Sequence, residues 1–199
     1  MFNIFRRQRR DYDVVFGIGL NKTGTTSLMR AFKTLDFGHK HYDPALIDLH
    51  FRGRHQEIFR RIQGYETFED WPWPLMYKEI YENYGRRAKF ILTRRASPSV
   101  WVESLKRHAE RTGPNVGPRS RIFGHDSPEG REGEFVEYYE RHLHEVRQYF
   151  SDPRRKGLMI EVCFEEGDGW KEICAHLGKP APRQRRFPHL NASKSTSTN

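Results

Sequence analysis

The stretch "VVFGIGLNKTGTTSL", residues 14–28, constrains the fold of this chain more than any other feature of its sequence. It begins with β-branched and aromatic residues closed by glycines, which predict a buried strand over residues 12–19. A loop of Gly, Asn, Lys and Thr follows, and residues 24–36 have the apolar spacing of a helix. A strand, a glycine-containing loop and a helix N-terminus direct backbone N–H groups and the positive end of the helix dipole toward one point. The unit is typical of a phosphate-binding site.

The rest of the chain continues the alternation of strands and helices. Further strands are predicted at residues 39–42, 65–68, 88–93 and 158–162. Helices are predicted at residues 44–63, 74–84, 98–110, 134–150 and 168–177. This order predicts an α/β fold with a central parallel β-sheet and helices on both faces. Ligands of such sheets bind beyond the carboxyl ends of the strands, where the motifs discussed below are expected to meet.

The length of 199 residues, without an internal repeat, predicts a single domain over residues 12–191. A basic N-terminal arm, residues 1–11, precedes it, and residues 192–199 are a Ser- and Thr-rich tail expected to be disordered. Residues 111–133 are rich in Gly, Pro and Arg and are too long for a plain connection. They are expected to form a lid or acceptor loop, with an ordinary surface loop as the alternative.

The charge balance limits the partners of the protein. There are 35 Lys and Arg residues against 26 Asp and Glu, a net charge of +9, which predicts a polyanionic partner or a highly charged small ligand. Nucleic acid is not expected, because basic and aromatic residues are not interleaved and no known nucleic-acid module is visible. No stretch approaches the roughly 20 apolar residues of a transmembrane helix, and a cytoplasmic location is expected. Cys163 and Cys174 lack metal-ligand spacing, so reduced thiols and no metal site are predicted.

The position of the lysine distinguishes this loop from an ordinary ATP-binding loop. Gly19 and Gly24 have the spacing of a Walker A motif, but Thr25 follows where lysine is required, and Lys22 lies in mid-loop. The strand at 88–93 is followed by two arginines rather than by the aspartate that holds Mg²⁺ in many nucleotide hydrolases. Arginines there suit a second anion rather than a metal ion. A nucleotide kinase with a degenerate loop remains an alternative.

Two segments together carry a resemblance to a known family. "GLNKTGTTSL" resembles the 5′-phosphosulfate loop of sulfotransferases, which use 3′-phosphoadenosine 5′-phosphosulfate (PAPS). "KFILTRRASPSVWVESL" resembles their second signature, a strand ending in Arg and a following helix with Ser, which bind the 3′-phosphate. "EDWP" and the end of the chain, with the pattern F-P-H-x-N, resemble one bacterial and eukaryotic subgroup. The resemblance spans residues 14–191 in the expected order and implies a P-loop NTPase-like sulfotransferase fold.

The resemblance also implies a cofactor site for PAPS without a required metal. Its implied residues are Asn21, Lys22, Thr23, Gly24, Thr25, Thr26 and Ser27 for the 5′-phosphosulfate, and Arg95 and Ser104 for the 3′-phosphate. The spacing from Arg95 to Ser104 is one residue longer than the usual family pattern. A bulge can absorb the extra residue; otherwise Arg94 takes part, or Ser97 or Ser99 supplies the hydroxyl.

Sulfuryl transfer resembles phosphoryl transfer, an in-line displacement in which the protein supplies position and electrostatics. Lys22 is expected to neutralise charge on the leaving phosphate. A general base is expected to help the acceptor hydroxyl lose its proton. Asp70 is preferred for this role, although it is also placed to cap the next helix, and His41 and Asp43 are alternatives.

The sequence thus predicts transfer of a sulfuryl group to a hydroxyl, or less favourably an amine, of a small-molecule, lipid or carbohydrate acceptor. The arginines of residues 111–133 favour an anionic acceptor. A nucleotide kinase and a non-enzymatic polyanion or nucleic-acid binder are the alternative functions.

Overall fold

The computed structural model describes residues 10–113, 117–183 and 185–188, and it has a four-stranded parallel sheet at its centre. The strands are β1 (Val14–Gly17), β2 (Thr67–Phe68), β3 (Ala88–Thr93) and β4 (Met159–Val162). Their order across the sheet is β2-β1-β3-β4, and Phe16 of β1 pairs with Phe68 of β2 and with Phe90 of β3. The predicted α/β fold with a parallel sheet is confirmed.

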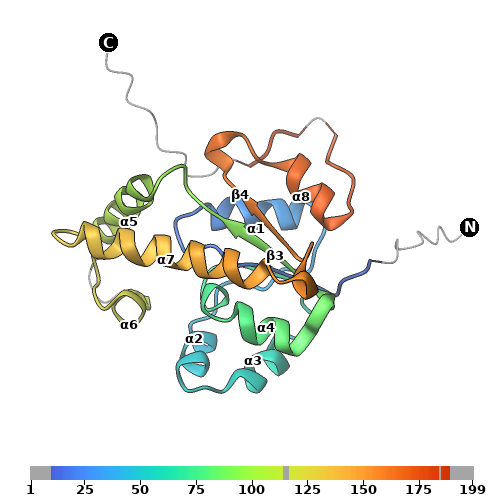
Figure 1. The fold of residues 1–199 in the computed structure, drawn as a ribbon, viewed down its shortest axis with the longest axis horizontal. Helices are drawn as coiled ribbons and strands as arrows, with labels where there is room; N and C mark the ends of the chain where they lie inside the picture. Colours follow the sequence, from blue (N-terminus) through green and yellow to red (C-terminus); the bar gives the residue numbers. More distant parts are fainter. Residues whose placement is uncertain (1–9, 114–116, 184, 189–199) are drawn as a thin grey trace, which may run out of the picture.

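Helices cover both faces of this sheet (Figure 1). They are α1 (Thr25–Thr34), α2 (Pro44–Phe51), α3 (His55–Arg61), α4 (Tyr77–Tyr84), α5 (Pro98–Thr112), α6 (Arg119–Phe123), α7 (Glu132–Phe150) and α8 (Trp170–Leu177). Short 3₁₀ turns are η1 (Trp73–Leu75), η2 (Gly85–Arg87), η3 (Pro153–Arg155) and η4 (Phe164–Glu166). Successive strand residues point to opposite faces, so one core forms on each side. Val15 and Ile91 pack with α1 and α8, whereas Phe16 and Phe90 face α4 and α7.

Two predicted elements are wrong. Residues 39–42 do not form a strand: His39 alone makes an isolated bridge to Thr67, and the chain then turns into α2, whose first turn is capped by Asp43. Residues 44–63 do not form one helix but two, α2 and α3, which are separated at Gly53. Gly53 has φ 69°, in the left-handed region that favours glycine and ends a helix.

The described part of residues 111–133 packs on the domain through α6. Phe123 contacts the rings of Trp71, Trp101 and Phe135, and Arg119 is buried, donating hydrogen bonds to Thr112 Oγ1 and the Gly113 carbonyl. Aromatic packing and a buried guanidinium tie this segment to α5 and α7. Whether it acts as a lid stays a prediction.

Both termini fall largely outside the described residues, so most of the predicted arm and the whole tail are not described. Cys163 and Cys174 are buried free thiols. Within the described ranges, no helix is long and apolar enough to cross a membrane.

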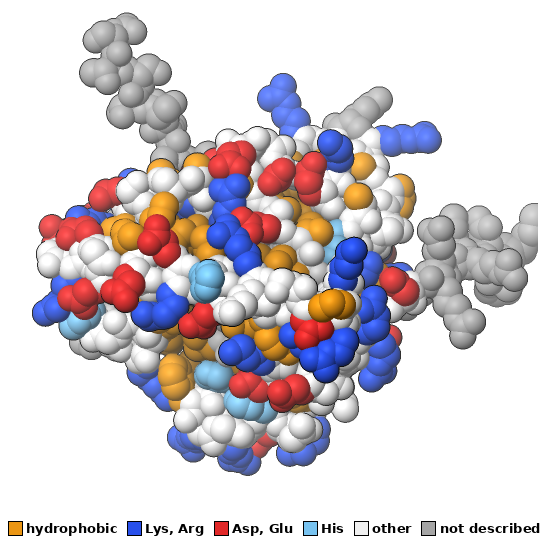
Figure 2. Space-filling model, in the orientation of Figure 1, with side chains coloured by type: hydrophobic (Ala, Val, Ile, Leu, Met, Phe, Trp, Pro, Cys, Tyr) orange, Lys and Arg blue, Asp and Glu red, His pale blue; other side chains and the backbone are white. Residues whose placement is uncertain are grey.

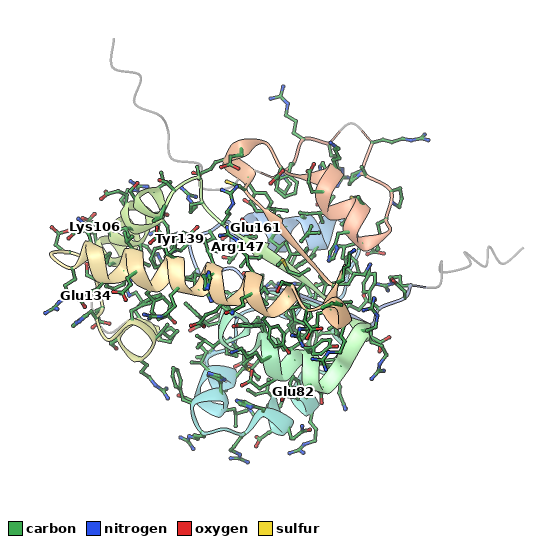
Figure 3. All side chains as sticks on the ribbon, viewed as in Figure 1. Glu82, Lys106, Glu134, Tyr139, Arg147 and Glu161 are labelled. Atoms are coloured by element: carbon green, nitrogen blue, oxygen red, sulfur yellow. The ribbon has the colours of Figure 1, made fainter. Side chains whose placement is uncertain are left out.

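Positive and negative side chains are interspersed over the face drawn in Figure 2. Figure 3 shows one such pairing, Arg147 of α7 beside Glu161 of β4.

Candidate active site

A cavity of about 210 Å³ lies at the carboxyl edge of the sheet. Four segments contribute to it: the loop after β1 with the start of α1, the residue pair after β2, the corner after β3, and one face of α5. Its lining residues are Asn21, Lys22, Gly24, Thr25, Thr26, Asp70, Arg95, Ser104, His108 and Arg111. The structure therefore brings together most of the residues that the sequence assigned to the cofactor, and Asp70 with them.

The loop after β1 is fixed by close packing against β3. A Cβ atom at Gly19 would lie 2.2 Å from the Thr93 carbonyl oxygen, so only glycine fits there. The Thr23 hydroxyl donates to the Leu20 carbonyl at 2.6 Å and lies 2.6 Å from Thr93 Oγ1. Thr23 is 2% exposed and does not line the cavity, so its side chain holds the loop rather than facing a ligand. Ser27 is likewise buried and outside the lining.

A second contact holds the loop from the side of α5. Trp101 is fully buried, and its indole N–H donates to the Asn21 carbonyl at 2.8 Å. Asn21 Oδ1 is buried without a hydrogen-bond partner among the described residues. The residue at the N-cap of α1, Gly24, has φ 108° and no side chain with which to cap the helix. The first N–H groups of α1 are thus left for a ligand, as at other anion-binding helix N-termini.

Lys22 lies in the left-handed region at φ 68°, a conformation that is costly for a residue other than glycine and is common at functional sites. The pKa of Lys22 is lowered, first by burial and then by the positive charges of Arg111 and, more weakly, Arg95, while Asp70 opposes the shift. Lys22, Arg95 and Arg111 therefore outnumber the carboxylate of Asp70 among the residues that line this cavity, which favours binding of an anion.

Two adjacent carboxylates, Glu69 and Asp70, follow β2. Burial raises the pKa of each, and the charge of Glu69 raises the pKa of Asp70 further. Thr25 hydrogen-bonds to Glu69, and the Trp71 N–H donates to Asp70 Oδ1 at 2.9 Å. Asp70 also has a left-handed φ of 65°. The result is a carboxylate with raised proton affinity on the wall of the cavity that also holds Lys22.

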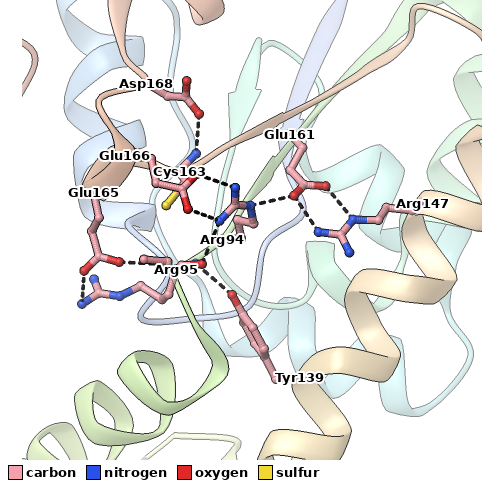
Figure 4. Close-up of polar contacts among 10 residues, drawn as sticks. Arg94, Arg95, Tyr139, Arg147, Glu161, Cys163, Glu165, Glu166 and Asp168 are labelled. Atoms are coloured by element: carbon pink, nitrogen blue, oxygen red, sulfur yellow. Dashed lines mark hydrogen bonds and ion pairs between the residues drawn. The ribbon is translucent and has the colours of Figure 1, made fainter.

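The two arginines after β3 have different surroundings (Figure 4). Arg94 donates from Nε to Glu161 at 2.8 Å and from Nη1 and Nη2 to Glu166 at 2.9 and 2.6 Å. Arg95 lines the cavity, and within the described residues its buried Nε and Nη2 have no well-aligned hydrogen bond. One ion pair, from Nη2 to Glu165 Oε1 at 2.8 Å, contacts it. Of the two arginines, Arg95 is the one available to a ligand.

Helix α5 presents Ser104, His108 and Arg111 on one face, because residues four and seven positions apart lie above each other. Arg111 Nη2 lies 3.1 Å from His108 Nδ1. Burial and the nearby charges of Lys22 and Arg119 lower the pKa of His108 to about 4, so the ring is neutral at pH 7 and its Nδ1 accepts from Arg111. The sequence interpretation missed His108 and Arg111 as cavity residues, although their helical spacing from Ser104 was a usable signal.

Ser97 and Ser99, the alternative hydroxyls, lie at the start of α5. Ser97 is the N-cap, accepting from the Val100 N–H at 3.3 Å, and its Oγ lies 2.9 Å from Ser99 Oγ. Neither serine lines the cavity, whereas Ser104 does.

The structure does not bring His41 and Asp43 to the cavity. His41 is exposed, with Nε2 3.2 Å from Lys33 Nζ, and the positive charge of Lys33 lowers its pKa. Asp43 caps α2 by accepting from the Ala45 N–H at 3.1 Å and pairs with Lys40 at 3.1 Å. His41 thus contacts Lys33 of α1, whereas Asp43 is held by the start of α2 and by Lys40.

A parallel sheet that carries a phosphate-type loop and a basic cavity at its carboxyl edge is typical of α/β proteins that bind phosphorylated ligands. A comparison with family models then identifies the group: the model of the sulfotransferase domain matches residues 14–121 and 116–196. The chain therefore belongs to the sulfotransferase domain family, whose members are PAPS-dependent transferases of the sulfuryl group. No curated protein matches the chain. Membership of this family favours the sulfotransferase over the two alternatives from the sequence, a nucleotide kinase and a polyanion binder.

Proposed function

We propose that the cavity holds PAPS between the loop after β1 and the corner after β3, and that the sulfuryl group passes to a hydroxyl of a small anionic acceptor. The observation that carries the proposal is the shared cavity of Lys22 and the N-terminus of α1 with Arg95 and Ser104. This arrangement offers positive charge and hydrogen-bond donors at two separate positions. PAPS has negative charge at two matching positions, the 5′-phosphosulfate and the 3′-phosphate.

The donor set fits this cofactor. Arg95 Nε, buried and without a partner in the described chain, suits a phosphate oxygen, because guanidinium groups bind phosphate through parallel N–H donors. The N–H groups at the N-terminus of α1 and the Thr26 hydroxyl suit a second phosphate. PAPS supplies an activated sulfuryl group whose leaving group is a phosphate. Lys22 supplies the positive charge that stabilises negative charge developing on that phosphate.

Asp70 is the proposed general base. A base near the acceptor hydroxyl is effective when its pKa is close to the working pH, and burial beside Glu69 shifts the pKa of Asp70 upward in that direction. Its position opposite Lys22 in the same cavity supports this role, and His41 and Asp43 lack such a position. His108 is a second candidate base from the structure, because it is neutral at pH 7 and lines the cavity.

The acceptor is proposed to carry a carboxylate, phosphate or sulfate group. Lys22 and Arg95 are assigned to the two ends of PAPS, which leaves Arg111 without an anion in the cavity. His108 holds Arg111 through the contact between His108 Nδ1 and Arg111 Nη2 at 3.1 Å. A fixed guanidinium next to the reacting groups favours an anionic substrate.

Calorimetric titration with adenosine 3′,5′-bisphosphate, in buffer with EDTA, tests the cofactor assignment. We expect the wild type to bind the bisphosphate with micromolar affinity and Arg95→Ala to bind it more weakly. The affinity for adenosine 5′-monophosphate, which lacks the 3′-phosphate, should be the same in both proteins. Arg111→Ala is expected to keep the bisphosphate affinity and to weaken binding of 4-hydroxybenzoate, but not of 4-hydroxybenzamide, to the bisphosphate-saturated protein. If Arg95→Ala lost affinity for both adenine nucleotides equally, the assignment of Arg95 to the 3′-phosphate would be contradicted.

A further inference from the structure

The carboxylate of Glu165 lies beside Arg95 at the corner after β3 (Figure 4). Glu165 lies in η4, just after β4, and reaches across to the neighbouring strand. Its Oε1 lies 2.8 Å from Arg95 Nη2, and its Oε2 accepts from the Ala96 N–H at 2.9 Å. One carboxylate thus engages a guanidinium and a backbone donor, a combination that also suits a phosphate.

The contact between Glu165 and Arg95 is poorly aligned. Arg95 Nη2 meets the distance for an ion pair but has no hydrogen bond of normal geometry within the described chain. The neighbouring Arg94 shows what a complete set of contacts looks like, with hydrogen bonds to Glu161 and Glu166 at 2.6 to 2.9 Å. Arg95 therefore keeps donor capacity that its carboxylate partner does not use.

The two partners also differ in how tightly the protein encloses them. The Arg95 side chain is 10% exposed, whereas that of Glu165 is 34% exposed. A partly exposed glutamate can turn into solvent while the enclosed guanidinium stays in place. A phosphate bound at Arg95 would repel the adjacent carboxylate, and the more exposed glutamate is the partner that can move away.

We propose that Glu165 is an internal counter-ion for Arg95, which the 3′-phosphate of the nucleotide displaces on binding. The proposal rests on the assignment of Arg95 to the 3′-phosphate made above. Glu165 then sets the affinity for 3′-phosphorylated nucleotides: it lowers that affinity by a constant factor and leaves nucleotides without a 3′-phosphate unaffected. It also speeds release of adenosine 3′,5′-bisphosphate, the product that must leave before the next turnover.

The test compares Glu165→Gln with Glu166→Gln, a matched control that removes the same charge from the next residue, whose partner is Arg94. Glutamine keeps the size of the side chain and an oxygen for the Ala96 N–H. We expect Glu165→Gln to bind adenosine 3′,5′-bisphosphate about three- to tenfold more tightly, the scale of a partly exposed ion pair. Binding of adenosine 5′-monophosphate should be unchanged, and Glu166→Gln should bind both nucleotides as the wild type does.

Unchanged or weaker binding of the bisphosphate by Glu165→Gln would overturn the proposal, since it would mean that Glu165 orients Arg95 instead of competing for it. A failure of the underlying assignment has a different signature: the wild type would bind the bisphosphate no better than the monophosphate, and Arg95→Ala would affect both equally. Stopped-flow displacement of a fluorescent bisphosphate analogue gives a second readout, with slower release expected from Glu165→Gln.

Discussion

Two groups of charged residues lie at the carboxyl edge of the sheet and are organised in opposite ways. In the first, around Arg94, Arg147 and Glu161, every charge faces a partner at hydrogen-bond distance. These contacts raise the pKa of both arginines and lower that of Glu161. In the cavity the directions are reversed, with the pKa of Lys22 lowered and that of Asp70 raised.

The difference shows what each group contributes. Shifts that favour the charged forms mean that the Arg94 group stabilises the fold by its own contacts. Shifts that disfavour the charged forms mean that the cavity keeps unbalanced charge in the folded protein, at a cost in stability. Such a cost is typical of a site prepared for a ligand.

The largest effect is expected from Lys22→Ala. Loss of the positive charge at the leaving phosphate should reduce kcat/KM by about 10³, the scale seen when a preorganised charge-stabilising donor is removed. The measurement is formation of adenosine 3′,5′-bisphosphate from PAPS in the presence of phenolic acceptors. Lys40→Ala, which removes the same charge beside Asp43, should retain most activity. Comparable losses in both variants would show that net charge, rather than position, matters.

Asp70→Asn is expected to reduce kcat by about 10², within the range for a general base. A base acts only when ionised, so wild-type kcat should fall as the pH drops through the raised pKa of Asp70. The pH profile of Asp70→Asn should lack this fall in kcat at low pH, the acidic limb of the profile. His41→Ala and Asp43→Ala should keep both the rate and the profile. If His108→Ala instead removed the limb, His108 would be the base.

Much of this contrast could not be predicted from the sequence. The loop after β1 and the strand β3 were identifiable because apolar runs closed by glycine or followed by arginine have a strong local pattern. Arg95 was preferred to Arg94 only through the family resemblance, because the roles of the two arginines depend on Glu161, Glu165 and Glu166, which reach them only through the pairing of β3 with β4. Pairing between distant segments leaves no local pattern.

The mistaken strand and helix have similar explanations. His39 extends beside Thr67 for a single bridge, which an isolated stretch of polar and aromatic residues does not distinguish from a strand. Gly53 was visible, but glycine inside a helical pattern is tolerated as often as it ends one. The raised pKa of Asp70 could not be predicted from the sequence either, because it depends on burial beside Glu69 and not only on adjacency in the chain.

Arg95→Ala and Arg94→Ala separate binding from stability at the same corner. Arg95→Ala should weaken binding of adenosine 3′,5′-bisphosphate by about 10- to 100-fold, the value of hydrogen bonds between charged groups. Arg94→Ala should leave that affinity within about twofold but lower the free energy of unfolding by about 1–2 kcal/mol, because Glu166 loses its partner and Glu161 keeps only Arg147. Titration calorimetry and urea unfolding measure the two quantities. An equal loss of affinity in both variants would assign the 3′-phosphate to the pair of arginines.

The smallest effect is the pH dependence of stability. A folded-state pKa that is raised above the unfolded value gives stability that is present at low pH and is lost as the pH rises through the folded pKa. Asp70→Asn removes this loss, so its stability relative to the wild type should increase as the pH rises from about 4, the unfolded value, to about 7, the folded value, and should stay level above that. Glu161→Gln should behave in the opposite way, because the pKa of Glu161 is lowered: its cost should be full at neutral pH and should fade as the pH drops through that lowered pKa. Urea unfolding of the two variants from about pH 3 to about pH 8 measures both slopes, and slopes of the same sign would show that the two groups of charges are not organised in opposite ways.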